Sequence, residues 1–372
     1  MKRRRWPAVP RARAWPALAL LLACTLCLSG CAWLATPPQT AALRSAPPAG
    51  LPQRAERDAV PFFPQTPYHC GPAALATVLA DQGLPADPAA LGEAVFLPAR
   101  GGSLQLEMLT GARRQGAVAT RLPPELGALL QEVAAGHPVL VLQNLGLGWA
   151  PRWHYAVVVG YDLATQTLVL RSGTVRREQL SLRTFEHTWA RAGHWAVVVL
   201  APGRLPATAR EAEAVEATLG FGRVAPPAAL ARAWQAVQTR WPGRLLATMG
   251  LGNALHADGD LAGAAAAFEA AARQHDSAAA WHNLGLTRAA LGDAAGAQAA
   301  LAQALARAQA AEPGWLPAVQ RALQGLQAPT PTHTPALTPA PLPAPTPAPT
   351  TAPPAAAPAH ALTPPSPPAR GG

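Results

Sequence analysis

Cysteine is scarce in this chain of 372 residues, which has only four, three of them within the first 31 residues. Cys70 is the single cysteine of the remaining sequence. One thiol cannot form an internal disulfide, and zinc sites with a single cysteine ligand are uncommon. The sequence therefore argues against a disulfide-stapled scaffold and predicts neither a metal site nor a cofactor. A lone thiol is either an inert core residue or a reactive group.

Long hydrophobic runs are missing as well. The N-terminal apolar run is too short for a comfortable membrane span, and it follows basic residues as an export signal does. It ends in Leu28-Ser29-Gly30-Cys31, which resembles the lipobox of bacterial lipoproteins. The resemblance implies that residues 1–30 are a removable signal peptide and that Cys31 is lipidated. Ala32 follows Cys31, and its resemblance to lipoproteins that lack Asp at this position implies anchoring in the outer membrane, facing the periplasm.

Acidic residues are fewer than basic ones, with 20 Asp and Glu against 30 Lys and Arg. Removal of residues 1–30 would take away six basic residues and no acidic one, so the formal charge would fall from +10 to +4. No basic stripe with interleaved aromatic residues remains. The high isoelectric point therefore does not predict nucleic-acid binding.

Composition divides the rest of the chain into four segments. Residues 31–58 are rich in Pro, Ala and polar residues and are predicted to be a flexible tether. At the other end, 16 of the 42 prolines lie between Pro329 and Pro368. Residues 327–372 are therefore expected to be a disordered tail rich in Pro, Ala and Thr. Two folded domains are predicted between these segments, over residues 59–203 and 204–326.

Residues 59–203 carry helical patterns first and strand patterns afterwards. Helices are expected over residues 71–82, from Pro88 behind an Asp87 cap, from Ser103, and over residues 123–135. Strands are expected over residues 139–143, 154–161, 167–171, 179–182 and 195–200. Helices followed by short strands of antiparallel appearance indicate an α+β domain.

Residues 204–326 repeat themselves with an offset of 33. Leu251-Gly252, Gly259-Asp260, Phe268 and Ala271 recur as Leu284-Gly285, Gly292-Asp293, Leu301 and Ala304. The pattern resembles the tetratricopeptide repeat, in which a small residue lets two antiparallel helices approach each other. We expect an all-α, tetratricopeptide-like domain whose surface contacts a protein or peptide partner. A generic Ala-rich array of helical hairpins is the alternative and predicts nearly the same structure.

The segment from Gln65 to Leu75 contains the first candidate catalytic residues. It reads Gln-Thr-Pro-Tyr-His-Cys-Gly-Pro-Ala-Ala-Leu and places Cys70 where a loop enters a helix. Backbone N–H groups and the positive helix end stabilise a thiolate there and raise its reactive fraction. Gly71 would let a substrate backbone approach closely. The spacing of Gln65 would aim its amide at the oxygen of a tetrahedral intermediate, beside the Cys70 N–H.

A cysteine nucleophile needs a base, and the histidines are not equal candidates. His69 is adjacent at the helix start and points away, His137 sits in a turn, and His187 lies in a helix-like stretch. His154 and His194 both open apolar strands. His154 is favoured because it stands at the mouth of a buried strand, where a rigid element would hold an imidazole near the start of a helix.

Together these features resemble the bacteriocin-processing, double-glycine type cysteine peptidases of the papain-like group. Those enzymes combine a Gln-then-Cys-Gly motif with a strand that opens on His and ends in Gly-Tyr-Asp, as residues 154–162 do here. The resemblance covers residues 60–200 and implies a papain-like fold and peptide-bond hydrolysis through an acyl-enzyme. It implies Cys70 as the nucleophile, His154 as the general base and Gln65 in the oxyanion hole.

One position departs from that family. The family orients its histidine with the Asp of an Asp-Pro pair, whereas this chain has Ser172 followed by Gly173. A neutral hydroxyl can fix a tautomer but stabilises an imidazolium less than a carboxylate does. Asp162 and Asn144 are alternatives for the orienting role, although Asp162 is also typical of a turn at a strand end.

Two functions therefore remain open. The first is an envelope cysteine peptidase acting on a peptide or protein substrate. The second is a catalytically lapsed peptidase fold that works as a peptide-binding or protein-binding lipoprotein scaffold.

Overall fold

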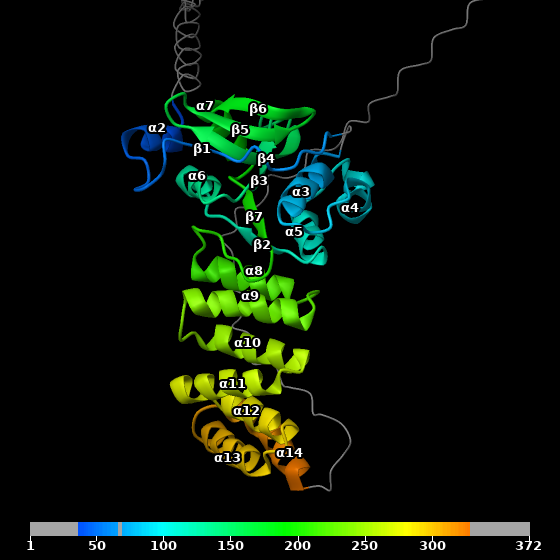
Figure 1. The fold of residues 1–372 in the computed structure, drawn as a ribbon, viewed down its shortest axis with the longest axis vertical. Coiled ribbons are helices and arrows are strands. Elements are labelled where there is room, and N and C mark those ends of the chain that lie inside the picture. Colours follow the sequence, from blue (N-terminus) through cyan, green and yellow to red (C-terminus); the bar gives the residue numbers. More distant parts are fainter. Residues whose placement is uncertain (1–35, 66–68, 328–372) are drawn as a thin grey trace, which may run out of the picture.

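The computed structural model describes residues 36–65 and 69–327, which form a sheet domain followed by a stack of helices (Figure 1). The helices of the sheet domain are α2 (Pro38–Ser45), α3 (Cys70–Asp81), α4 (Pro88–Val95), the 3-10 turn η1 (Pro98–Arg100), α5 (Gln105–Arg114), α6 (Leu126–Ala134) and α7 (Leu182–Ala190). Its strands are β1 (Arg54–Glu56), β2 (Val118–Arg121), β3 (Val139–Asn144), β4 (Trp153–Asp162), β5 (Thr167–Ser172), β6 (Val175–Ser181) and β7 (Ala196–Leu200). Within the described residues, no helix has the length and apolarity needed to cross a membrane.

A single antiparallel sheet organises the first domain. Its strand order is β2-β7-β3-β4-β5-β6, and β1 pairs with the far half of β4. The ten-residue strand β4 is hydrogen-bonded to β3 and β1 along one edge and to β5 along the other. Helices followed by antiparallel strands confirm the predicted α+β class of this domain.

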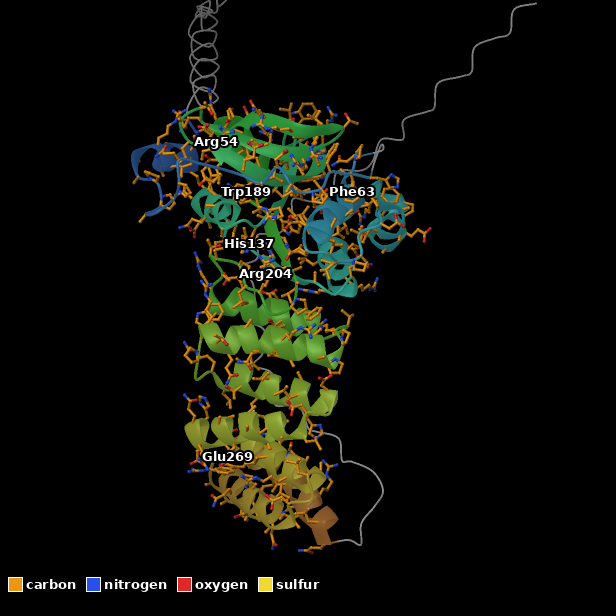
Figure 2. All side chains as sticks on the ribbon, viewed as in Figure 1. Arg54, Phe63, His137, Trp189, Arg204 and Glu269 are labelled. Carbon is orange, nitrogen blue, oxygen red and sulfur yellow. The ribbon has the colours of Figure 1, made fainter. Side chains whose placement is uncertain are left out.

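The sheet carries a hydrophobic core on each face. Tyr155, Val157 and Val159 of β4 pack with residues of α3, α4 and α5, whereas Ala156 and Val158 pack with residues of α6 and α7. Figure 2 shows the two sides, with Phe63 beside α3 and Trp189 on the side of α6 and α7. Strands β3 and β7 are buried along their whole length, which explains their continuous apolar runs.

Residues 38–56 are folded, which corrects the prediction of a flexible tether over residues 31–58. Helix α2 packs against α6 and α7. The buried carboxylate of Glu186 accepts hydrogen bonds from the Gln39 N–H (2.8 Å) and from the N–H and hydroxyl of Thr40. Because these partners are separated by about 146 positions in the chain, no local pattern predicts the contact. Residues 31–35, the predicted signal peptide and Cys31 lie outside the described residues, as does the predicted tail beyond residue 327.

The predicted helices and strands of the sheet domain are present with shifted ends. Helix α3 begins one residue earlier than predicted, at Cys70. Asp87 caps α4 as expected, its carboxylate accepting hydrogen bonds from Ala89 and Ala90. Helix α6 begins only at Leu126, and β6 is longer than the predicted strand. The four-residue strand β2 was too short to give a pattern.

The helical stack comprises α8 (Glu211–Phe221), α9 (Pro227–Arg240), α10 (Leu245–Asp258), α11 (Leu261–His275), α12 (Ala278–Ala290), α13 (Ala294–Ala310), the 3-10 turn η2 (Pro313–Trp315) and α14 (Leu316–Gln327). From α8 to α14, each α-helix packs against the next one in the chain. Gly252 of α10 lies against the ring of Phe268 in α11, and Gly285 of α12 lies against Leu301 in α13. The two sequence units therefore share one packing arrangement, in which a glycine makes room for a bulky residue on the neighbouring helix.

A buried carboxylate ties the sheet domain to the segment that leads into the stack. Glu132 accepts hydrogen bonds from the N–H groups of Ala207 (3.0 Å) and Thr208 (2.6 Å), and it lies 2.7 Å from His137 Nδ1. Burial raises the pKa of Glu132, but the hydrogen bonds from His137 and Thr208 outweigh it and hold that pKa below its ordinary value. Figure 2 shows His137 between the sheet and the first helices of the stack.

Gly252→Ala is expected to destabilise the stack, because an added Cβ would lie 2.5 Å from the Phe268 ring. Such overpacking costs about 1–3 kcal/mol. Gly325 of α14 is the matched control, since nothing lies within 4 Å of the place of its Cβ. Gly325→Ala should instead stabilise by about 0.4–1 kcal/mol, because it lowers the entropy of the unfolded chain. Urea unfolding followed by circular dichroism measures both; shifts of equal sign would contradict this account of the packing.

Candidate active site

Cys70 is the first residue of α3 and is half-buried. Gly71 to Leu79 are buried, so the helix is held on all sides and its start is fixed in place. Pro72 falls in the first turn, where a missing N–H group costs no helical hydrogen bond. An added Cβ on Gly71 would lie 2.6 Å from Ser103 Oγ, so the helix start also packs tightly against the segment before α5. The predicted position of the thiol at a helix start is confirmed.

His154 is the second residue of β4, and its Nε2 lies 3.0 Å from the hydroxyl of Ser172 at the end of β5. The antiparallel register places Val157 opposite Arg171, which brings the end of β5 beside the start of β4. Ser172 is buried. The residue at the position of the family's aspartate is therefore the one that contacts this histidine.

Cys70 lies close to the same end of β4. Helix α3 packs on β4, and the side chain of Tyr155 is in the core cluster against which Cys70 packs. The pKa of Tyr155 is raised, mainly by burial and further by the negative charges of Cys70 and Glu107. The thiol is thus within electrostatic reach of the residue that follows His154. The start of α3 therefore lies near Tyr155, and the end of β5 lies near His154.

The environment of His154 favours the neutral imidazole. Burial lowers its pKa; the carboxylate of Glu178 opposes this effect and the guanidinium of Arg152 reinforces it. The ring is therefore uncharged near neutral pH, the form that can accept a proton. The same burial disfavours the imidazolium that would form after proton transfer.

Gln65 is held beside the same strands. Its backbone N–H donates to the carbonyl of Gly173 (3.0 Å), and its side-chain amide donates to the carbonyl of Tyr155 (3.4 Å). The segment before it is fixed by Arg171, whose buried guanidinium donates to the carbonyl oxygens of Asp58 and Val60. Sequence reasoning missed Arg171. An arginine within an otherwise apolar strand was the available signal.

The other histidines lie elsewhere. The ring of His194 packs edge-to-face on Trp189, with 4.7 Å between the ring centroids, on the side of the sheet that carries α6 and α7. His69 stacks on Phe96, with centroids 5.0 Å apart. His194, the rival candidate from the sequence, is therefore on the face opposite to α3.

Asp162 and Asn144 do not orient His154, so both alternatives from the sequence are wrong. Asp162 is eight residues further along β4, about 26 Å at the usual rise of a strand. Its carboxylate accepts a hydrogen bond from the N–H of Thr165 (3.0 Å), as expected of a turn residue. The side-chain oxygen of Asn144 accepts hydrogen bonds from Gly146 and Arg152 (both 2.9 Å) and thereby stabilises the loop between β3 and β4.

Two polar side chains near Cys70 were not singled out from the sequence. Ser103 Oγ and Glu107 Oε2 are buried and lack a hydrogen-bond partner within the part of the chain that the structure describes. Both belong to the segment that opens α5, which packs against the start of α3. In the same described part, no three His, Cys, Asp or Glu side chains are grouped as metal ligands would be.

Comparison with known proteins gives a family match for part of the chain. A family model described as Peptidase_C39 like family matches residues 57–197. Among solved structures, a C39-like peptidase from Bacillus anthracis is similar, with 17% identity and a TM-score of 0.34 over 40% of this chain and 98% of that chain. The peptidase domain of Streptococcus ComA, a bifunctional ABC transporter involved in a quorum-sensing pathway, has 20% identity and a TM-score of 0.31 over 38% of this chain and 98% of that one. No curated protein matches the chain. Residues 57–197, which contain Cys70, His154 and Ser172, thus match the Peptidase_C39 like family and form a peptidase-like domain.

Proposed function

We propose that this protein is a cysteine peptidase in which Cys70 is the nucleophile and His154 is the general base. The observation that carries the proposal is the 3.0 Å contact between His154 Nε2 on β4 and the Ser172 hydroxyl on β5, in a strand on which α3 packs with Cys70 at its start. Elements of this kind hold side chains more precisely than loops do.

The chemistry follows from these groups. His154 takes the proton of the Cys70 thiol as the sulfur attacks the carbonyl carbon of a peptide bond. The leaving amine receives that proton from the imidazolium, and a thioester to Cys70 remains. Water, deprotonated by His154, then attacks the thioester, the acid is released, and the thiol regains its proton.

Ser172 and Gln65 are assigned supporting roles. Because Ser172 lies at hydrogen-bond distance from Nε2, it can select the tautomer in which Nδ1 accepts the proton of the thiol. The amide of Gln65, which donates to the Tyr155 carbonyl in the present structure, would turn to donate to the oxyanion together with the Cys70 N–H.

A second candidate function is peptide binding without turnover. The neutral partner of His154 and the burial that lowers its pKa both favour it, because both weaken the imidazolium that catalysis requires. In that case the helical stack would be the main working surface.

We also propose that the protein is anchored to a membrane and binds a partner. Cys31 would carry the lipid that anchors the protein to the outer membrane, with the folded part in the periplasm. The helical stack would be a tetratricopeptide-like domain that binds a protein or peptide partner. The shared packing of Gly252 with Phe268 and of Gly285 with Leu301 supports a true repeat.

Peptide hydrolysis is the direct test, with the full chain carrying Cys24→Ser, Cys27→Ser and Cys31→Ser, here called the unacylated chain. A mixture of peptides read by mass spectrometry should be cleaved, and Cys70→Ala should abolish cleavage. His154→Ala should lower kcat by about 10²–10⁴-fold, and Gln65→Ala by up to about 10²–10³-fold.

His194→Gln is the matched control for that test and should change kcat little, because His194 lies on the other face of the sheet. Cleavage that survives Cys70→Ala, or a folded chain that cleaves no peptide, would refute the peptidase assignment. The latter result would favour the binding function.

Ser172→Asp is expected to increase kcat/KM by about tenfold or more, because a carboxylate beside Nε2 stabilises the imidazolium. In the unsubstituted enzyme the acidic limb of the pH–kcat/KM profile should lie below about pH 6.5, the ordinary imidazole value, since burial lowers the pKa of His154. In Ser172→Asp the limb should move to higher pH, because the new charge raises that pKa.

Ser172→Ala separates this charge effect from loss of the hydrogen bond. It should lower kcat/KM by roughly fivefold, the equivalent of about 1 kcal/mol for a neutral hydrogen bond. Identical pH profiles for Ser172→Asp and Ser172→Ala would show that Ser172 does not act on the catalytic histidine.

A further inference from the structure

Large apolar side chains are exposed in two short segments near the candidate site. Nine such side chains are exposed in the described part of the chain, and six of them lie in these two segments. They are Leu104, Leu106, Leu145, Leu147, Trp149 and Trp153, and we call them the apolar rim. Trp149 is 81% exposed, Leu106 65% and Trp153 51%. Single exposed apolar residues are ordinary, but a concentration of this kind marks a contact surface.

The loop between β3 and β4, which carries three of the six, is rigidly built. Leu147 and Ala150 exchange backbone hydrogen bonds of 3.1 Å, and the Leu145 N–H donates to the Arg152 carbonyl (2.8 Å). The side chain of Asn144 adds two further bonds from inside the loop. A Cβ on Gly146 would lie 2.3 Å from the Ala150 carbonyl oxygen, so only glycine fits there. The structure therefore presents Trp149 to solvent on a fixed scaffold, which suits a binding surface.

Both segments of the rim adjoin elements that carry residues of the candidate site. Trp153 directly precedes His154 and is two residues before Tyr155, whose side chain lies in the core cluster against which Cys70 packs. Leu104 and Leu106 open α5 directly after Ser103, whose hydroxyl lies against Gly71.

We propose that the apolar rim is the specificity surface of this site and binds bulky apolar side chains, such as Leu, Ile or Phe, next to the scissile bond of a peptide substrate. The inference rests on the proposed peptidase function and names its substrate class. A peptide is the expected occupant because the rim adjoins the elements that carry Cys70 and His154, where a substrate of the proposed peptidase has to bind. The aromatic side chains gain most from desolvation, so they are the expected hot spots.

The test compares the unacylated chain with its Trp149→Ser and Trp153→Ser variants on the same peptide mixture. Cleavage sites of the unsubstituted chain should be enriched in bulky apolar residues within two positions of the cut. For the best such peptide, each variant should lose about tenfold or more in kcat/KM, mostly through KM, and should lose little for peptides with polar residues there. Leu291→Ser is the matched control, an exposed apolar residue of the helical stack, and should leave every value unchanged.

Peptide binding by an inactive variant tests the inference independently of catalysis. The Cys70→Ala variant of the unacylated chain is titrated calorimetrically with the best apolar peptide, or with a Leu-rich and a Ser-rich peptide of equal length if no cleavage is found. Preference for the apolar peptide that Trp149→Ser abolishes supports the rim even where hydrolysis fails. Equal binding of both peptides, or equal binding by the Trp149→Ser variant, overturns it.

Sedimentation with lipid vesicles tests the alternative occupant of the apolar rim, a membrane surface. Sedimentation with vesicles of phosphatidylethanolamine and phosphatidylglycerol should not differ between the unacylated chain and its Trp149→Ser variant. Vesicle binding that depends on Trp149, together with unchanged peptide binding and turnover, would make the rim a membrane contact and the inference wrong.

Discussion

Strand β4 is hydrogen-bonded along both edges, to β3 and β1 on one side and to β5 on the other. This pairing determines where the residues of the candidate site lie. It sets the end of β5 against the start of β4, so that Ser172 meets His154. A shift of one residue in the register would turn these side chains to the other face. Helix α3, buried from Gly71 to Leu79, is fixed on the same strand and holds Cys70 there. The site is therefore a product of sheet register and helix packing.

The proposed chemistry depends on Ser172, the neutral hydrogen-bond partner of His154. Burial favours the uncharged ring near neutral pH, which is suitable for accepting a proton, but the residue in contact with it, Ser172, is a neutral hydroxyl that stabilises the resulting charge less than a carboxylate would. Proton transfer should therefore accompany attack on the substrate, instead of preceding it as a stable ion pair. The apolar rim is consistent with this design, because a substrate that covers it removes water from the thiol and imidazole and strengthens the remaining polar contacts.

Local motifs predicted the parts of the site that depend on short spacing. The helix start next to Cys70, the strand start next to His154 and the α+β class all follow from patterns within a few residues, and the family resemblance pointed to Ser172. Contacts between distant residues were beyond such patterns. Glu186 anchors α2 from about 146 positions away, and Arg171 fixes the segment before Gln65 from the other side of the domain. The prediction of a flexible tether failed because the contact between Glu186 and α2 joins distant parts of the chain. The roles offered to Asp162 and Asn144 failed because strand ends were treated as near one another without the pairing that shows which ends meet.

The assignment of a cysteine peptidase depends on activation of the Cys70 thiol by His154. The most direct measurement is the rate of Cys70 alkylation by iodoacetamide between pH 5 and 9, in the unacylated chain and in its His154→Ala variant. We expect the rate near neutral pH to fall by about tenfold or more in the variant, with little difference at high pH where the thiol ionises unaided. Equal rates across the whole range, or a thiol protected in both folded proteins, would contradict the account. Cys70 would then be a packing residue of a binding fold.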